Sequence, residues 1–356
     1  MSPVAAPSAV PSPPSLFGLT RSSLGQVLTD RGFPRYRADQ IFSWVYQKHH
    51  LDAGRMTNLP GPLRAGLQDV CDMDLPQVAA VLSTPDQLTH KFLLELSDGA
   101  RVECVSMRTQ RRLTFCLSSQ VGCALKCTFC ATGLLGLKRN LKAHEIVAQV
   151  LRMGDFHHWR DARFNVVFMG MGEPLVNLDP VLDSIRILHD DRGVGLGARR
   201  VTISTAGVVP GIRQLAEAEL PLGLAVSLHA TNDELRSRLV PLNQRWPLRE
   251  LLAAARDYGR RTGRRTTLEY TLLAGVNDGP EDARRLAEIA RSLPSKINLI
   301  PYNPVPGLDW KRPTPEAMEA FVQQLYPVAP AVTLRQTLGG EIWAACGQLG
   351  GLSPAA

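Results

Sequence analysis

The chain has 356 residues, of which 44% are hydrophobic and 21% charged, and a formal net charge of +7. These values indicate a globular protein of about two domains and exclude a wholly disordered chain. No apolar run reaches the roughly 18 residues of a membrane helix, and residues 1–15 lack the basic and apolar regions of a signal peptide. We therefore expect a cytoplasmic protein without membrane contact, and the positive charge favours a polyanionic partner.

Residues 16–75 are predicted to form a small basic helical domain, which follows a Pro-rich, disordered tail over residues 1–15. Ile41 and Val45 are spaced to share one face of a helix. Between residues 21 and 64 the chain carries seven Lys or Arg and three Asp or Glu, which is a local net charge of +4. This excess indicates either a surface that grips an RNA backbone or an ordinary solvated face.

A β-hairpin is predicted next, within residues 76–110. The apolar-rich runs Lys91–Leu96 and Arg101–Val105 flank Asp98-Gly99, a pair that supplies the positive φ of a tight turn. We expect this hairpin to link the helical domain to the rest of the chain.

From residue 111 to residue 349, short apolar strands alternate with amphipathic helices. The predicted strands are Leu113–Leu117, Asn165–Met169, Arg200–Ser204, Leu222–Ser227, Thr266–Tyr270, Lys296–Ile300 and Val332–Gln336, and the clearest helices are Ala143–Arg152 and Asp282–Leu293. This alternation predicts right-handed βαβ units and a parallel α/β sheet, either open or closed into a barrel. Ligands of such sheets bind at the C-terminal ends of the strands. Residues 350–356 are predicted as a second tail.

The seven cysteines are Cys71, Cys104, Cys116, Cys123, Cys127, Cys130 and Cys346. An odd number in a large chain without an export signal favours reduced thiols, and Cys71 and Cys104 are interpreted as structural. Cys123, Cys127 and Cys130 have the spacing C-x3-C-x2-C, which suits an iron–sulfur cluster or a zinc ion. A structural zinc site normally takes four ligands, whereas three thiolates on a four-iron cluster leave one iron open. Chance spacing of buried structural cysteines is the alternative.

This cysteine loop is followed, after the second parallel strand, by Gly172-Glu173-Pro174. Together the two motifs resemble the signature of the radical S-adenosylmethionine superfamily. The resemblance implies a partial (β/α)6-type TIM barrel over residues 111–349, preceded by the helical domain and the linking hairpin. It also implies a 4Fe-4S cluster on the three cysteines, with an open iron that binds S-adenosylmethionine (SAM).

Two further cysteines narrow the resemblance. Cys116 stands seven residues before Cys123, and Cys346 stands in the segment Ala-Ala-Cys-Gly-Gln-Leu near the C-terminus. With the cysteine loop, they are similar to the bacterial radical SAM RNA adenine-C2 methyltransferases, which modify 23S ribosomal RNA and transfer RNA. The resemblance covers residues 16–349, nearly the whole chain.

The resemblance implies roles for several residues of this chain. The residues that would bind SAM are Gly172, Glu173, Ser204, Ser227, Leu228, His229 and Asn303. Cys346 would carry a methyl group as S-methylcysteine, Cys116 would be the resolving thiol that forms a transient disulfide with it, and Glu103 would be the proton acceptor. Cys116 is the chemically economical alternative as acceptor. Apart from the resemblance, Glu103 is equally compatible with a solvent-facing strand carboxylate opposite basic residues.

The chemistry of adenine explains the need for two lone cysteines. C2 lies between two ring nitrogens, so it is neither nucleophilic nor usefully acidic, and its methylation requires a radical. In the family, one SAM methylates the cysteine and a second yields a 5′-deoxyadenosyl radical, which removes hydrogen from the S-methyl group. The carbon radical adds to C2, a base removes the C2 proton, and the second thiolate releases methylated RNA and leaves a disulfide.

The implied partners are 23S ribosomal RNA, transfer RNA and an electron donor such as a flavodoxin-type reductant, and we expect a monomer. The RNA should be single-stranded or locally opened, because a cysteine arm does not reach C2 inside a helix. Two alternatives stay open. One is methylation of C8 of the same adenine, which confers antibiotic resistance, and the other is a non-catalytic iron–sulfur RNA-binding protein.

Overall fold

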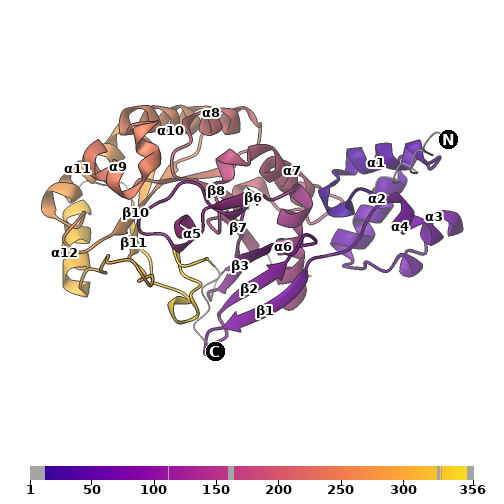
Figure 1. The fold of residues 1–356 in the computed structure, drawn as a ribbon. Helices are drawn as coiled ribbons and strands as arrows, with labels where there is room; N and C mark the ends of the chain where they lie inside the picture. The colour runs from indigo at the N-terminus through magenta and orange to yellow at the C-terminus, as the bar shows by residue number, and fades with distance from the viewer. Residues whose placement is uncertain (1–12, 111, 159–163, 327–328, 330, 351–356) are drawn as a thin grey trace, which may run out of the picture.

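A computed structural model describes residues 13–110, 112–158, 164–326, 329 and 331–350. Three parts follow one another along the chain in Figure 1: a helical N-terminal region, the strands β1 to β3, and a larger α/β region. Most of the predicted N-terminal tail, residues 1–12, lies outside the described residues. Its last residue, Ser15, forms a parallel bridge with Asp72.

Short helices make up the N-terminal region. They are η1 (Leu16–Gly18), α1 (Arg21–Asp30), α2 (Arg37–Phe42), the π-helical η2 (Ser43–Gln47), η3 (Ala53–Arg55), α3 (Gly61–Ala65) and α4 (Leu67–Val70). Thr20 caps α1, because its hydroxyl accepts a hydrogen bond from the backbone N–H of Ser23. Ile41 and Val45 are buried, although the helix that carries them changes from α to π geometry after Phe42.

Ten strands form one mixed sheet in the described residues, in the order β1-β2-β3-β4-β7-β8-β9-β10-β11-β12. Their bounds are β1 (Gln77–Ser83), β2 (Thr89–Glu95), β3 (Arg101–Arg108), β4 (Leu113–Cys116), β7 (Phe164–Phe168), β8 (Val201–Thr205), β9 (Gly223–Ser227), β10 (Thr266–Leu272), β11 (Ser295–Pro301) and β12 (Val332–Leu334). Neighbours from β1 to β4 are antiparallel, and neighbours from β4 to β12 are parallel. The predicted hairpin is therefore present as β2 and β3, and β3 joins the parallel strands through β4.

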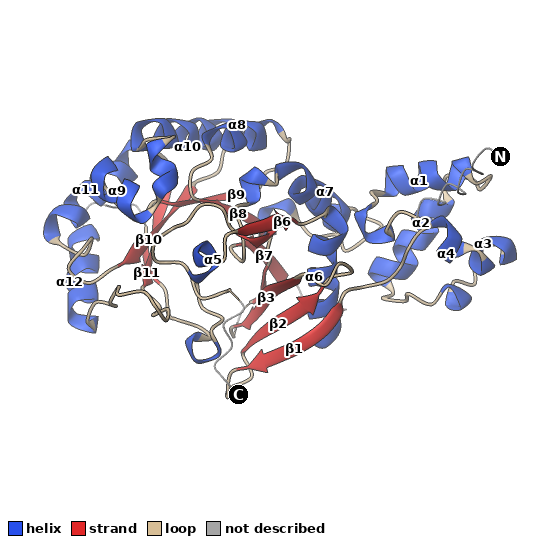
Figure 2. Cartoon of the chain, in the orientation of Figure 1, coloured by secondary structure: helices blue, strands red, loops and turns tan. Residues whose placement is uncertain are grey.

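Helices follow the parallel strands in turn. They are α6 (Ala143–Phe156), α7 (Leu178–His189), α8 (Val209–Glu217), α10 (Leu248–Thr262), α11 (Pro280–Ser292) and α12 (Pro315–Leu325), with the shorter α5 (Ala131–Leu134) and α9 (Asp233–Leu239) in the loops. Figure 2 shows the long helices around the outside of the strands. Six strand–helix units and a seventh strand confirm the partial (β/α)6 barrel. Within the described residues no pairing joins β12 to β1, so the sheet is open.

Residue spacing explains how these helices pack on the sheet. In α11, Ala283, Leu286 and Ala290 are buried, whereas Arg284 and Glu288 are exposed, which is the pattern of a helix with one face against a core. Two short strands, β5 (Gln120–Gly122) and β6 (Leu137–Asn140), pair separately over the cysteine loop. In the described part of the chain, no helix combines the length and the hydropathy that a membrane crossing requires.

Candidate active site

The cysteine loop lies between β5 and α5, where the parallel strands end. The backbone N–H of Cys123 donates to the Gly136 carbonyl at 2.9 Å, and that of Cys130 donates to the Cys127 carbonyl at 3.2 Å. These hydrogen bonds curl the loop so that Cys123, Cys127 and Cys130 line one cavity of about 160 Å³. The structure thus brings together the three predicted cluster ligands.

Residues at the ends of four parallel strands line the same cavity. They are Gly172 and Glu173 after β7, Ser204 in β8, Ser227 and His229 at and after β9, and Asn303 after β11. Leu228 is the exception among the predicted SAM-binding residues, because its side chain is buried and does not line the cavity. Its backbone N–H donates to the Glu269 carbonyl at 2.9 Å, which leaves Leu228 a positioning role in this wall.

Glu173 is a buried carboxylate in the cavity wall. Its Oε2 accepts a hydrogen bond from the Ala206 N–H at 2.8 Å, and its Oε1 accepts one from the Leu175 N–H at 3.1 Å. Burial raises the pKa of Glu173 to about 7, and these hydrogen bonds oppose the rise. A positive charge nearby favours the ionised form of such a group. The position of Glu173 therefore suits a ligand with an ammonium group.

Arg236 on α9 is a fully buried arginine that the sequence did not single out. Its guanidinium donates to the carbonyls of Ala206, Ser227 and Leu228, at 2.6 to 3.1 Å, and to Asn243 Oδ1 at 2.8 Å. Burial lowers the pKa of Arg236 to about 10. The side chain ties the loop after β8 to the loop after β9, so it fixes the backbone of the cavity wall.

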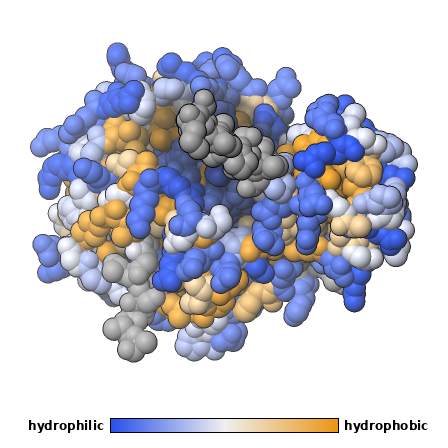
Figure 3. Space-filling model, turned by 45° about the vertical axis from the view of Figure 1, so that its right-hand side comes forward, coloured by the Kyte–Doolittle hydropathy of each residue, from blue (hydrophilic) through white to orange (hydrophobic). Residues whose placement is uncertain are grey.

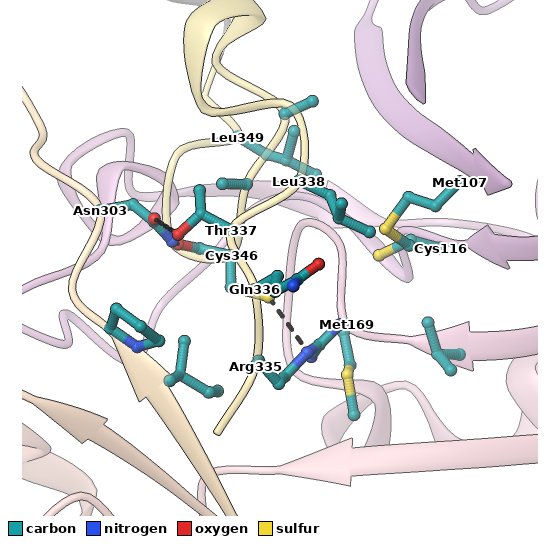
Figure 4. A pocket seen from close by; sticks show the side chains of 15 residues that line it. Met107, Cys116, Met169, Asn303, Arg335, Gln336, Thr337, Leu338, Cys346 and Leu349 are labelled. Atoms are coloured by element: carbon teal, nitrogen blue, oxygen red, sulfur yellow. Dashed lines mark hydrogen bonds between the residues drawn. The ribbon is translucent and has the colours of Figure 1, made fainter. Parts of the chain in front are cut away.

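A second pocket of about 40 Å³ adjoins the first, and Cys116 and Cys346 both line it. Figure 4 shows the two cysteines on opposite sides of this pocket. Met169, Ile300, Asn303 and Cys346 line both cavities. Cys116 is buried and Cys346 is exposed, and both are free thiols. Burial raises the pKa of the Cys116 thiol to about 12, and the neighbouring Cys346 adds to the rise.

Arg335, directly after β12, reaches into this thiol pocket and is a further residue that the sequence did not single out. Its Nη1 lies 3.8 Å from Cys346 Sγ, as the dashed line in Figure 4 marks. Cys346 raises the pKa of Arg335, with smaller contributions from Glu269 and Cys116. Arg335 is therefore the cation that stands next to the Cys346 sulfur in this pocket.

A buried ion pair holds the Cys346 segment on both flanks. Lys91 Nζ lies 3.2 Å from Glu103 Oε1, and both side chains are 3% exposed. Lys91 also donates to the Trp343 carbonyl at 3.3 Å, and the Gly350 N–H donates to Glu103 Oε2 at 3.0 Å. The interpretation of Glu103 as a solvent-facing carboxylate is therefore wrong. Glu103 lines neither cavity and faces the hairpin and the C-terminal segment instead.

The donor chemistry of the larger cavity fits an iron–sulfur cluster. Cysteine thiolates are the ligands that such clusters take. Burial raises the pKa of the Cys123 thiol to about 11, and coordination to a metal deprotonates a thiol outright. Within the described residues, no group of three or more His, Cys, Asp or Glu side chains is positioned to hold a single metal ion. The fit to a cluster therefore concerns the kind of donor atoms that line the cavity. The cavity continues beyond the cysteines to Glu173 and Asn303, which leaves room for an organic ligand beside a cluster.

Two family models match the chain. Residues 117–287 match the model described as the Radical SAM superfamily, and residues 15–73 match the Ribosomal RNA large subunit methyltransferase N-terminal domain. The first range contains the cysteine loop and most of the parallel strands, and the second contains the N-terminal helices.

Relatives match over almost the whole length. The chain is 47% identical to the probable dual-specificity RNA methyltransferase RlmN of Symbiobacterium thermophilum, over 93% of this chain and 90% of that one. It is 44% identical to the dual-specificity RNA methyltransferase RlmN of Rhodopseudomonas palustris, over 95% of this chain and 90% of that one. It is also similar to the crystal structure of a radical SAM methyltransferase from Sphaerobacter thermophilus, with a TM-score of 0.90, 45% identity and coverage of 94% and 99% of the two chains.

Proposed function

Because this chain belongs to the RlmN family of radical SAM RNA methyltransferases, we propose that it methylates C2 of adenine in 23S ribosomal RNA and in transfer RNA. The observation that carries this proposal is the position of Cys346, which lines the cavity of the three cysteines and also the pocket of Cys116. A sulfur that relays a methyl group must meet a cofactor on one side and a resolving thiol on the other. The place of Cys346 at the border of the two cavities supports this role.

The larger cavity is the proposed cofactor site. Its cluster ligands are Cys123, Cys127 and Cys130, and its SAM-binding residues are Gly172, Glu173, Ser204, Ser227, Leu228, His229 and Asn303. When bound, the 4Fe-4S cluster supplies the electron that cleaves SAM to a 5′-deoxyadenosyl radical. Glu173 acts as the counter-ion of the ammonium group, and Leu228 contributes only through its backbone. Arg236 positions both loops through their carbonyls.

Cys346 performs the methyl relay in this proposal. As a thiolate beside Arg335, it accepts a methyl group from one SAM, and its S-methyl group then loses a hydrogen atom and adds through carbon to adenine C2. The adduct loses the C2 proton to a base and one electron, which the oxidised cluster would take up. The Cys116 thiolate then attacks the Cys346 sulfur, the bond from sulfur to the methylene carbon breaks with its electron pair on that carbon, and the carbon takes up a proton to become the methyl group on C2. A Cys116–Cys346 disulfide remains.

Glu103 is the proposed acceptor of the C2 proton, with Cys116 as the alternative. A base must come within hydrogen-bond reach of the proton it removes, and Lys91 and the Gly350 N–H occupy the two oxygens of Glu103. Glu103 therefore acts after the Cys346 segment has shifted. With C2-deuterated RNA, the adduct that Glu103→Gln accumulates should retain deuterium. If that adduct has lost it, Cys116 is the acceptor.

Anaerobic enzyme reconstituted with iron and sulfide tests the whole proposal. We expect 5′-deoxyadenosine from SAM, no methyl incorporation by Cys346→Ala with the visible absorbance of the cluster intact, and a covalent protein–RNA adduct with Cys116→Ala. Cys71→Ala, a buried cysteine in the N-terminal helices, is the matched control and should keep activity. Zinc uptake without SAM cleavage would contradict the proposal, as would free turnover by Cys116→Ala.

Mass spectrometry of the modified adenosine separates C2 from C8 methylation. We expect 2-methyladenine in both RNA classes, and 8-methyladenine as the sole product would overturn the assignment. The basic N-terminal helices are the proposed grip on the RNA backbone. Each phosphate contact makes RNA affinity fall more steeply as salt rises. The salt dependence of RNA binding should therefore weaken when Arg31, directly after α1, and Arg64 of α3 are replaced by Gln.

A further inference from the structure

Three exposed leucines stand next to the cysteine loop. Leu134, Leu135 and Leu137 are 58%, 47% and 41% exposed. Leu134 ends α5, Leu135 follows it, and Leu137 begins β6. Apolar surface shows in several separate patches on the face in Figure 3, so exposure alone does not single out these leucines. Their position does, because α5 begins directly after Cys130.

Backbone hydrogen bonds attach this segment to two of the three cysteines. The Cys123 N–H donates to the Gly136 carbonyl at 2.9 Å, and the Gly133 N–H donates to the Cys130 carbonyl at 3.1 Å. Gly122 has a φ of 81°, and a Cβ atom there would lie 1.9 Å from the Gly136 oxygen. The close approach therefore requires glycine at that position. The exposed leucines are thus held in a fixed relation to the proposed cluster ligands.

Basic side chains surround the leucines. The exposed lysines of this region are Lys126, Lys138 and Lys142. Arg139 of β6 pairs with both Asp98 and Glu145, at 2.7 and 2.8 Å, so the neighbouring carboxylates are already engaged. Among the ion pairs of the described residues, none includes these three lysines. The segment therefore presents an apolar centre with a positive rim.

We propose that this surface, the Leu134 patch (Leu134, Leu135, Leu137, Lys126, Lys138 and Lys142), docks an acidic one-electron donor protein of the flavodoxin type. The inference rests on the proposed function, because a cluster that cleaves SAM takes up one electron for each cleavage. The reduced flavin of the donor loses that electron and the cluster gains it. An apolar centre with a charged rim is the usual anatomy of a protein interface, and charge complementarity speeds the encounter.

RNA is the other polyanion that the lysines would attract. Proteins bind single-stranded RNA by stacking aromatic side chains on the bases, in addition to basic contacts with phosphates. The aromatic residue of the segment 120–142 is Phe129, and it is buried. The exposed side chains are aliphatic, which gives a protein partner apolar surface to bury and gives a base nothing to stack on. The observations favour a protein donor.

The experiment compares two reductants on enzyme with a reconstituted cluster: a reduced acidic flavodoxin, and dithionite, a small molecule that needs no docking surface. The variant Leu134→Ser/Leu135→Ser should bind flavodoxin at least about tenfold more weakly. Its cluster should lose visible absorbance at least about tenfold more slowly with flavodoxin in stopped flow. Reduction by dithionite and affinity for RNA should match the wild type. Val78→Ser replaces an exposed apolar residue on β1 and is the matched control. It should leave the rate of cluster reduction by either reductant unchanged.

A charge variant tests the rim separately. Lys126→Glu/Lys138→Glu should weaken flavodoxin binding most at low salt, because screening removes the steering that the lysines provide. Unchanged flavodoxin affinity in both variants would overturn the proposal. Loss of RNA affinity with intact flavodoxin binding would also overturn it and assign the patch to RNA. A wild type that fails to cleave SAM even with dithionite would contradict the proposed function. The docking proposal would still be tested in that case, because it is judged by the affinity for flavodoxin.

Discussion

The two cavities of the active site differ in size and in construction, although Cys346 borders both. The cofactor cavity measures about 160 Å³ and is walled by loops at the ends of β7, β8, β9 and β11, whereas the thiol pocket measures about 40 Å³ and has the segment 335–349 as one wall. A buried water needs about 10–15 Å³ by this measure. The thiol pocket thus holds a few waters at most, and an adenine enters it only when that segment shifts.

The side chains that hold the walls of the two cavities also differ. Arg236, which belongs to the barrel, holds the wall of the cofactor cavity through buried hydrogen bonds. The segment that closes the thiol pocket is anchored from the hairpin, by Lys91 at Trp343 and by Glu103 at Gly350, as well as from the barrel, where Asn303 donates to the Cys346 carbonyl. The difference supports our proposal of a preformed cofactor site and of a thiol pocket that opens to admit the nucleobase.

The largest effect is expected at Arg236. Arg236→Met leaves buried carbonyls without donors, so the free energy of unfolding should fall by about 4 kcal/mol and SAM should bind about 100-fold more weakly. Arg238→Met is the matched control, because Arg238 lies on the same helix and is exposed. Urea unfolding and equilibrium dialysis with SAM measure the two effects. Arg236→Lys should fold and still lose affinity for SAM. If it binds SAM normally, Arg236 does not position the cavity wall.

The next effect is expected at Lys91. Lys91→Met leaves the buried Glu103 carboxylate without its cation, and the free energy of unfolding should fall by about 3 kcal/mol. Amide hydrogen exchange should rise over residues 343–350 and stay unchanged around Arg236, since the Lys91 side chain bonds to the first region and not to the second. Arg101→Met breaks an exposed ion pair with Glu95 on the same hairpin and should cost less than about 1 kcal/mol.

A double-mutant cycle separates the interaction between Lys91 and Glu103 from the other losses of stability that each single variant causes. In the background Glu103→Gln, the change Lys91→Met should cost about 1–3 kcal/mol less than it does alone, because the buried charge it would strand is already absent. Additive losses would mean that Lys91 and Glu103 are not energetically coupled. Faster amide hydrogen exchange in the wall of the cofactor cavity, in either single variant, would contradict the separate anchoring of the two cavities.

Arg335 should affect reactivity more than stability. In apo enzyme, Arg335→Gln should slow the alkylation of Cys346 by iodoacetamide about tenfold, because the sulfur loses the cation that lies 3.8 Å from it. Arg335→Lys should restore part of the rate. Peptide mass spectrometry separates Cys346 from the other six cysteines, and Arg260→Gln on α10 serves as the control. An unchanged alkylation rate would show that Arg335 does not affect the reactivity of Cys346.

Much of the fold could be predicted, because β4 and β7 to β12 are short apolar runs that end at polar or Gly-rich turns. Strand β1 was missed, since its residues Gln77–Ser83 are largely exposed on both faces and carry no alternating pattern. Strands β5 and β6 have three and four residues, which is too short for any periodicity to appear. The spacing of the three cysteines is local, so the sequence located that part of the site.

The residues that anchor the cavities could not be found in the same way. Arg236 stands in the helical run Asp-Glu-Leu-Arg-Ser-Arg-Leu, where charged residues indicate a solvated face. Lys91 stands in a strand beside other polar residues. The sequence around Glu103 is compatible with a proton acceptor and with a solvent-facing carboxylate, and does not indicate a buried ion pair. Burial of these groups depends on the packing of segments more than a hundred residues apart, such as Lys91 and Trp343, and no local pattern encodes it.

The smallest predicted effect concerns acid, which should loosen the hairpin. Burial lowers the pKa of His157 to about 4, and His157 Nε2 lies 2.7 Å from the Ser106 hydroxyl of β3. The unfolded chain takes up this proton below about pH 6.5, so the contribution of His157 is complete above pH 6.5 and is lost as pH falls toward 4. His157→Gln should therefore reduce the fall in stability between pH 7 and 5 by about 1 kcal/mol. Urea titrations at both pH values measure it, with the exposed His158→Gln as the control, and equal slopes for wild type and His157→Gln would contradict a pH-sensitive hairpin.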